Sequence, residues 1–270
     1  MRNISRLIAV GAAMSSTLAS SFRVFDNTAY TNTSVGYGST NINWIHAYVC
    51  NPLTEGGTIP SADVWKAIVL EWNVYPSYPL VLACEVLYFT SSSTAGLYLK
   101  VMSTLQTWAA DVFPEGQIIG WYSLSRNTIS SLYGHYQELI GNYSNHAFFP
   151  SAYTFSDSIS TWNKSLTSVI NVINTINDTL PIWPYIWPQY HGNYSFIPGD
   201  LWQQELELLE ANRNLEGFVI WGGKNHAVCN DTYQATAALE PWLNITREYL
   251  DTLYGVYGGA ARKVGAQLFN

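Results

Sequence analysis

Charged residues are scarce in this sequence. Only 11% of the residues are charged, against 48% hydrophobic and 15% aromatic, a balance that excludes a disordered chain. The 12 Lys and Arg are not clustered and the net charge is −7, which argues against nucleic acid as a partner. No run after the N-terminal segment is long enough to cross a bilayer, so we expect no membrane span.

Three families of catalytic motif are also missing from the sequence. No glycine-rich phosphate loop follows any strand-like run, which disfavours nucleotide binding. The 5 histidines show no HExxH or close-paired spacing, and no GxSxG elbow occurs. We therefore expect no metal and no cofactor.

The N-terminal 21 residues have the pattern of a secretory signal peptide. Arg2 and Arg6 are followed by a short apolar stretch at 7–18, and small residues at 19 and 21 suit cleavage before Phe22. A buried N-terminal helix is the alternative interpretation. We expect a signal peptide at 1–21, one domain over 22–270, and an extracellular, secreted protein.

N-glycosylation sequons support the expectation that the protein is secreted. Downstream of the N-terminal segment, the N-x-[ST] pattern occurs at Asn32, Asn142, Asn163, Asn177, Asn193, Asn230 and Asn244. A surface covered by glycans would remain soluble with few charges. The 3 cysteines are an odd number, which leaves one thiol over in an oxidising compartment.

Short apolar runs alternate with longer helical patterns along the chain. Strands are predicted at 22–30, 42–49, 78–89, 117–124, 146–155, 180–190 and 217–221, and helices at 62–73, 95–112, 127–140, 158–177, 201–211 and 241–254. This alternation predicts an α/β fold with parallel strands, and the length suits a single-domain (β/α) TIM-like barrel of seven or eight strands. An open doubly wound sheet is the alternative.

Glu85 is the strongest catalytic candidate. It lies in the apolar run VLACEVLYF, where a carboxylate is costly to bury unless it is paired or functional. Catalytic groups of barrels lie at the carboxyl ends of strands, and apolar surroundings would suit Glu85 as a general acid. Strand alternation would direct Ala83 and Leu87 inward with Glu85, and would turn Cys84 toward the helices as a buried, free thiol.

Polar and aromatic residues end the other predicted strands. They are Asp26, His46, Tyr48, Trp121, Tyr122, Tyr153, Asp157, Gln189, Tyr190, His191 and Trp221. The carboxyl ends of barrel strands converge on one face, and aromatic rings there would stack on sugars. The sequence therefore indicates a carbohydrate site.

The order of these motifs resembles that of the hyaluronidases of animals and venoms, over roughly residues 22–257. FRVF at the first strand, VLACEVLYF, GWYSL, FPSAYTF, PIWPYIWPQYHG and GFVIWGG are similar to successive segments of that family. The resemblance implies that Glu85 is the proton donor, that Tyr153 contacts the transition state and that Trp221 walls the sugar pocket. It also relates Cys229 to a family cysteine, for which Cys50 is the available partner here.

The sequence departs from the family where Ala83 replaces the aspartate of an Asp-x-Glu motif. That aspartate orients the acetamido group of the substrate, which alanine cannot do. The chain would then use another carboxylate, such as Asp26 or Asp157, or cleave sugars that lack N-acetyl groups, or bind without catalysis. We expect a monomeric glycoside hydrolase that cleaves a polysaccharide, with Tyr122 and Tyr190 also contacting it. The alternative is a catalytically inactive carbohydrate-binding or structural glycoprotein on the same barrel.

Overall fold

A computed structural model describes residues 22–30, 33–36, 38–123, 129–143, 146–223 and 236–255. The predicted alternation of strands and helices is confirmed. The strands are β1 (Arg23–Thr28), β2 (Ser39–Asn41), β3 (Asn43–Ile45), β4 (Leu80–Leu82), β5 (Ile119–Tyr122), β6 (His146–Phe149), β7 (Tyr185–Ile186) and β8 (Gly217–Gly222). The helices are α1 (Ala47–Thr54), α2 (Ala62–Trp72), α3 (Ser92–Ala110), α4 (Tyr133–Gly141), α5 (Ile159–Ile176), α6 (Gly199–Ala211) and α8 (Pro241–Tyr254).

The strands form two parallel sheets of 4 strands each, with the orders β2-β1-β8-β7 and β3-β4-β5-β6. In the described part of the chain these ladders do not join into one closed barrel. Two links nevertheless connect the sheets. Chain continuity through Ile42 joins β2 to β3, and isolated parallel bridges join Phe148 to Ile182 and Ser151 to Tyr185.

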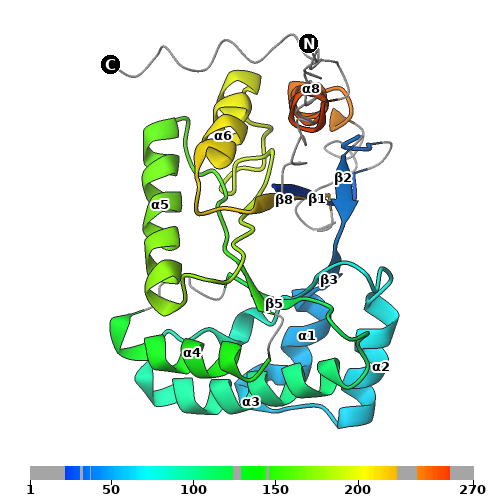
Figure 1. Cartoon of the computed structure of the whole chain (residues 1–270), viewed down its shortest axis with the longest axis vertical. Coiled ribbons are helices and arrows are strands. Elements are labelled where there is room, and N and C mark those ends of the chain that lie inside the picture. The colour runs from blue at the N-terminus through cyan, green and yellow to red at the C-terminus, as the bar shows by residue number, and fades with distance from the viewer. Residues whose placement is uncertain are drawn as a thin grey trace, which may run out of the picture.

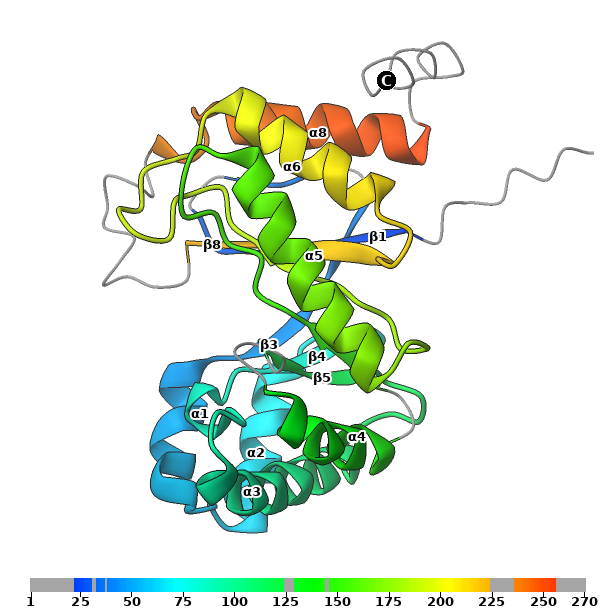
Figure 2. The ribbon, with the colours of Figure 1, turned by 90° about the vertical axis from the view of Figure 1, so that its left-hand side faces the viewer.

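The helices lie on the outer sides of the two sheets (Figures 1 and 2). Helices α1 to α4 cover the sheet that contains β3 to β6, and α6 and α8 cover the sheet that contains β1 and β8. Helix α5 runs alongside both halves, and it contacts α4 and α6. Gln137 Nε2 of α4 donates to the carbonyl of Ile176 at the end of α5 (3.2 Å).

Two hydrophobic clusters divide the core between the layers. The inner cluster lies between the sheets and contains Phe25, Ile42, Trp44, Val81, Ala83, Tyr122, Ala147, Phe149, Trp183, Tyr185 and Val219. The larger outer cluster packs the opposite strand faces against the helices. Strand alternation produces this division, because Phe25 and Val219 belong to the inner cluster while their neighbours Val24 and Phe218 belong to the outer one.

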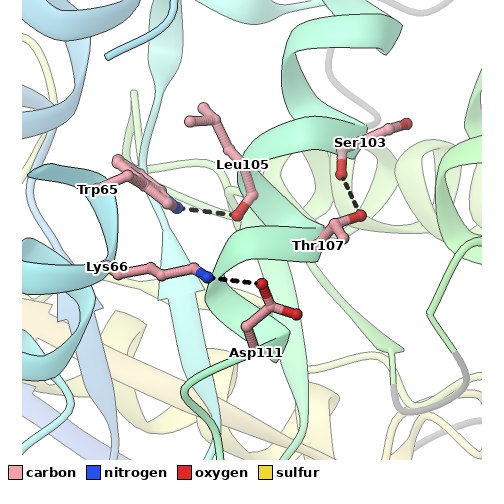
Figure 3. Close-up of polar contacts among 6 residues, drawn as sticks. All are labelled: Trp65, Lys66, Ser103, Leu105, Thr107 and Asp111. Atoms are coloured by element: carbon pink, nitrogen blue, oxygen red, sulfur yellow. Dashed lines mark hydrogen bonds and ion pairs between the residues drawn. The ribbon is translucent and has the colours of Figure 1, made fainter. Parts of the chain in front are cut away.

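Helices α2 and α3 show how the few charges are used in the outer layer (Figure 3). The indole Nε1 of Trp65 donates to the carbonyl of Leu105 (2.8 Å), which satisfies a fully buried polar group. Beside it, Lys66 Nζ lies 2.7 Å from Asp111 Oδ2 at the surface. The buried indole specifies how the two helices pack, whereas the exposed ion pair adds little stability.

Four predicted strands are much shorter than expected, since the runs at 146–155 and 180–190 pair regularly only at His146–Phe149 and Tyr185–Ile186, and two further runs show the reason. The run at 78–89 pairs only at Leu80–Leu82 and then forms a 3-10 turn at Glu85–Leu87. The run at 42–49 pairs only at Asn43–Ile45, since α1 begins at Ala47. Residues beyond the ends of these two ladders are buried by tertiary packing, as Cys50, Leu87 and Phe89 show. They are therefore as apolar as the strands themselves, and hydrophobicity did not show where the ladders end.

The expected Cys50–Cys229 bridge and free Cys84 are wrong. Cys50 is bonded to Cys84, with the two Cα atoms 5.2 Å apart, whereas Cys229 lies outside the described residues. Strands β3 and β4 are neighbours, with Ile45 opposite Leu82. Because α1 follows β3 directly, Cys50 lies in the outer cluster next to Cys84. Cys84 is buried on the helix side, as expected, and it pairs there.

The bridge predicts a measurable loss of stability in Cys50→Ser and Cys84→Ser. A loop of 34 residues restrains the unfolded chain, so each change should lower the free energy of unfolding by about 2–4 kcal/mol. Urea denaturation monitors the loss, and Cys229→Ser is the matched control that retains this bridge. Mass spectrometry of unreduced peptides that linked Cys50 to Cys229 would contradict the assignment.

Candidate active site

The candidate site lies at the carboxyl ends of the strands, where the inner cluster becomes aromatic. Trp44, Tyr122 and Tyr185 come from β3, β5 and β7 and form a compact group of rings. The centroid of Trp44 is 5.1 Å from that of Tyr122 and 4.9 Å from that of Tyr185. Asn27 Nδ2 of β1 donates to the hydroxyl of Tyr185 (3.2 Å). These side chains form the floor of the site.

Tyr153 is the centre of the site. It follows β6 and lies above the floor, with its ring centroid 6.3 Å from Tyr122 and 5.9 Å from Trp221. The rings of Trp187 and His191 flank it at 5.7 and 5.6 Å. Burial raises the pKa of Tyr153 well above its usual value, and Tyr122 and the carboxylate of Glu85 raise it further. The phenol therefore keeps its proton at neutral pH and can donate a hydrogen bond to a ligand.

Glu85 reaches this site from the rim. Strand β4 ends at Leu82, and Glu85 begins the 3-10 turn that follows. The expected apolar, buried setting is wrong, because the side chain of Glu85 is exposed. Its negative charge nevertheless contributes to the raised pKa of Tyr153, and both residues follow strand ends at the same edge of the parallel sheet that contains β4, β5 and β6. The neighbouring Cys84 anchors the turn to α1 through the disulfide.

Ala83 and Leu87 do not share an orientation. Ala83 is fully buried and belongs to the inner cluster, as expected. Leu87 belongs to the outer cluster, so its expected inward orientation is wrong. The change follows from the turn at Glu85–Leu87, which ends the alternation of the strand.

Trp221 and Trp187 form an aromatic wall on the other side of Tyr153. Their ring centroids are 4.8 Å apart and their planes are nearly perpendicular. The indole of Trp187 donates to the hydroxyl of Tyr30 (2.9 Å) and to Gln189 Oε1 (3.0 Å). Gln189 is fully buried and also donates to the carbonyl of Tyr194. Gln189 thus holds the wall in place.

The two aspartates proposed as alternative carboxylates lie apart from one another. Asp26 of β1 has the orientation of Val24, toward the outer layer, and accepts hydrogen bonds from the backbone and hydroxyl of Thr28 (2.9 and 2.7 Å). Asp157 accepts a hydrogen bond from the hydroxyl of Tyr190. Burial, together with Asp157, raises the pKa of Tyr190. Neither aspartate is shown in contact with the ring of Tyr153.

The sequence interpretation missed Trp44, Tyr185 and Trp187. The alternation in PIWPYIWPQY could have revealed Tyr185 and Trp187, because every second residue there shares a face. Three prolines interrupt the run, and only Tyr185–Ile186 is a regular strand. The orientation of these residues is set by bridges to β6 and by hydrogen bonds such as that from Tyr185 N to the carbonyl of Pro150 (2.8 Å).

A buried acid beneath the site was also missed. Glu205 of α6 is fully buried and accepts a hydrogen bond from the hydroxyl of Thr154, next to Tyr153 (2.7 Å). Desolvation raises its pKa to about 8, against the lowering effect of that hydrogen bond. The other carboxyl oxygen, Oε2, has no hydrogen-bond partner within the described chain. Glu205 is therefore neutral at pH 7 and supports the segment that carries Tyr153.

The site is organised for hydrogen bonding and ring stacking. Among the described residues, no group of three or more His, Cys, Asp or Glu is placed to hold a metal ion. The described helices include none that is long and apolar enough to span a bilayer. The arrangement combines an exposed carboxyl group, a protonated phenol and a wall of indoles, which suits a ligand with hydroxyl groups and apolar faces.

Comparison with known proteins identifies similar folds. No family model and no curated protein matches the sequence. Bee venom hyaluronidase superposes with a TM-score of 0.61 at 13% identity, over 84% of this chain and 100% of that chain. Bee venom hyaluronidase in complex with a hyaluronic acid tetramer gives 0.42 at 12% identity, over 81% and 68%. A GH113 beta-1,4-mannanase gives 0.48 at 10% identity, over 86% and 98%. At this identity the first similarity shows a distant glycoside hydrolase-like fold and nothing finer.

The buried acid predicts a pH-dependent difference between the protein and its Glu205→Gln variant. A folded-state pKa of about 8 exceeds the ordinary 4.5, so the folded protein holds a proton that the unfolded chain releases. Burial of this carboxyl group therefore lowers the free energy of unfolding by an amount that is zero below pH 4.5, grows as the pH rises, and reaches its full value above pH 8. The variant lacks it and should be more stable by on the order of 2–4 kcal/mol at high pH, with equal stability at low pH.

Urea denaturation of both proteins at low and high pH provides this measurement. Glu207→Gln is the matched control, since Glu207 is exposed on the same helix. An advantage of the Glu205→Gln variant that did not depend on pH would contradict the raised pKa.

Proposed function

We propose that this protein is a glycoside hydrolase that cleaves a polysaccharide, with Glu85 as the general acid. The proposal rests on one observation, the exposed carboxyl group of Glu85 in the turn after β4, at the same edge of the sheet as Tyr153, whose ring lies against Trp221. The resemblance to hyaluronidases and the fold similarity to bee venom hyaluronidase support it. We also propose that the two sheets are the two halves of a (β/α) barrel wall, because their inner faces share one cluster.

The geometry suggests a role for each group. The Glu85 carboxyl donates its proton to the glycosidic oxygen as the bond from that oxygen to the anomeric carbon breaks. Water then adds to the anomeric carbon and returns a proton to Glu85. The phenol of Tyr153 donates a hydrogen bond to an oxygen atom of the sugar, which positions the ring as the oxocarbenium-ion-like transition state forms. Trp221, which is partly exposed and is backed by the buried Trp187, provides a face on which a sugar ring stacks.

The residue at position 83 cannot act as the second catalytic group beside Glu85, because it is an alanine. Ala83 is fully buried in the inner cluster, at the position where hyaluronidases have an aspartate. Substrate-assisted attack guided by that aspartate is therefore unavailable, which favours substrates without an N-acetyl group or attack by water with another base. Asp26 has the orientation of Val24, toward the outer layer, which leaves Asp157 as the carboxylate proposed for that base.

The presence of alanine at position 83 also favours a second candidate function. A site that keeps Glu85, Tyr153 and Trp221 but lacks the aspartate would still bind sugars. A catalytically inactive carbohydrate-binding glycoprotein would need only the aromatic wall and the hydrogen-bond donors. The two functions differ in turnover and agree in binding, so one experiment separates them.

The Glu85→Gln variant tests the role of the acid. The amide keeps the shape of Glu85 and loses the transferable proton, so turnover should fall by about two to four orders of magnitude with little change in affinity. A reducing-end assay on a polysaccharide panel gives turnover, and calorimetry gives affinity. Glu71→Gln, an exposed position on α2, is the matched control.

Each outcome of this assay has a clear consequence. Unchanged turnover in Glu85→Gln would refute the hydrolase mechanism. Binding by the unmodified protein with no turnover on any polysaccharide would support the inactive binding protein instead.

We also propose that the protein is secreted as a monomer and carries N-glycans. Residues 1–21, Asn32 and Asn230 lie outside the described residues. Asn142, Asn193 and Asn244 are exposed, and Asn163 and Asn177 are partly buried. Exposed asparagines suit the transfer of a glycan, which needs access to the side-chain amide.

Expression with the full N-terminus in a eukaryotic secretory host tests this proposal. The protein should appear in the medium with Phe22 as its N-terminal residue and should lose mass on enzymatic deglycosylation. The Asn142→Gln and Asn193→Gln variants should each lose one glycan. Retention in the cell with residues 1–21 intact would contradict secretion.

A further inference from the structure

A second hollow adjoins the candidate active site and takes no part in the mechanism above. It lies between the segment after β6 and the first half of α5, and its volume is about 310 Å³. Ser151, Tyr153 and Phe155 line one side, Trp162 and Leu166 line the other, and Ser123 lines it from the end of β5. We call this hollow the side pocket. Tyr153 belongs both to the side pocket and to the active site, so the two adjoin at this residue.

The lining of the side pocket is neutral and combines hydroxyl groups with apolar rings. Its described lining residues include no Asp, Glu, Lys or Arg. Hydroxyl groups come from both walls, with Ser151 on one and Ser165 on the other. Phe155 is 64% exposed, and Trp162 is held by a hydrogen bond from its indole to the carbonyl of Ala152 (2.8 Å). Such a lining suits an uncharged ligand that carries hydroxyl groups on an apolar frame.

Ser123 carries two unfavourable features at this position. Its backbone has a φ of 52°, in the left-handed region that glycine adopts most easily. Its hydroxyl is buried and has no hydrogen-bond partner in the part of the chain that the structure describes. The backbone N–H of Ser123 does donate to the carbonyl of Phe149 (2.8 Å), so the strand end itself is well anchored. A glycine would adopt this backbone conformation more easily and would leave no unpartnered hydroxyl. Backbone strain and unsatisfied buried polar groups both lower stability, and they concentrate at functional sites.

We propose that the side pocket binds one neutral sugar unit of the polysaccharide, next to the unit that contacts Tyr153. The Ser123 hydroxyl, which loses no bond on rotating toward the pocket, bonds a hydroxyl of that sugar. A volume of about 310 Å³ is at the small end for ligand pockets, which suits one sugar ring. Without a cation in the described lining, a uronic acid is disfavoured. This subsite rests on the proposed carbohydrate function, and it narrows the substrate to a polymer with neutral units.

Calorimetry in a Glu85→Gln background tests the subsite without hydrolysis. The probes are cellohexaose, mannohexaose, chitohexaose and a hyaluronan hexasaccharide. Ser165→Trp fills the pocket from an exposed position on α5 and should weaken binding of the preferred neutral hexasaccharide at least tenfold. Ser168→Trp is the matched control on the same helix, outside the lining, and should change the affinity less than twofold.

Ser123→Gly provides a second, independent variant. It removes the hydroxyl and relaxes the backbone, so binding should weaken about three- to tenfold while the Tm stays equal or rises. A merely structural role for Ser123 would leave the affinity unchanged. The combination of weaker binding with undiminished stability is the signature of the subsite.

The outcomes separate the subsite from the proposed function. Unchanged affinity in both Ser165→Trp and Ser123→Gly overturns the subsite, and the hydrolase proposal stands if Glu85→Gln still abolishes turnover. Weaker binding in both variants, with no turnover by the unmodified protein, supports the subsite and overturns the hydrolase. No binding of any hexasaccharide overturns both, and tightest binding of the hyaluronan hexasaccharide overturns the neutral specificity.

Discussion

The packing of aromatic side chains between the two sheets is the constraint on which the rest of the structure depends. Short strands with few ladder hydrogen bonds are held in place because Phe25, Trp44, Tyr122, Tyr185 and Phe149 exclude water from the space between them. The same burial raises the pKa of Tyr153 and Tyr185, which keeps their hydroxyl groups protonated. Core packing and the chemistry of the site therefore have one cause.

The rim of the site depends on anchors of a different kind. The disulfide holds the turn that begins at Glu85, and the buried Gln189 holds Trp187 through its indole. Glu205 supports the segment that carries Tyr153 through the hydroxyl of Thr154. The anchored residues are Cys84, Gln189 and Thr154, and each lies one or two residues along the chain from the group that it positions. Loops without such anchors are generally mobile. The local anchors therefore hold the exposed carboxyl group of Glu85 and the partly buried phenol of Tyr153 in fixed positions.

The ligands that we propose for the site are neutral and hydroxylated rather than charged. Lys and Arg are few, and the groups that meet at Tyr153 are rings, hydroxyl groups and one carboxyl group. Position 83 presents only the buried methyl group of an alanine to the inner cluster, so a fold similarity does not by itself imply a shared mechanism. The side pocket extends the same neutral chemistry beyond Tyr153.

The sequence alone determined the alternation of strands and helices over most of the chain and the parallel strands, because apolar periodicity depends on local pattern, and it singled out Glu85, Tyr153 and Trp221 as candidates from their positions at strand ends. It predicted α8 at Pro241–Tyr254 to the residue, since proline and glycine mark its two ends. Only the tertiary structure decided that Cys84 pairs with Cys50, that β4 stops at Leu82 and that Glu85 is exposed. These features depend on which segments become neighbours across the sheets. A hydrophobic run has the same pattern whether a ladder or a packed turn buries it, so only the folded chain distinguishes the two.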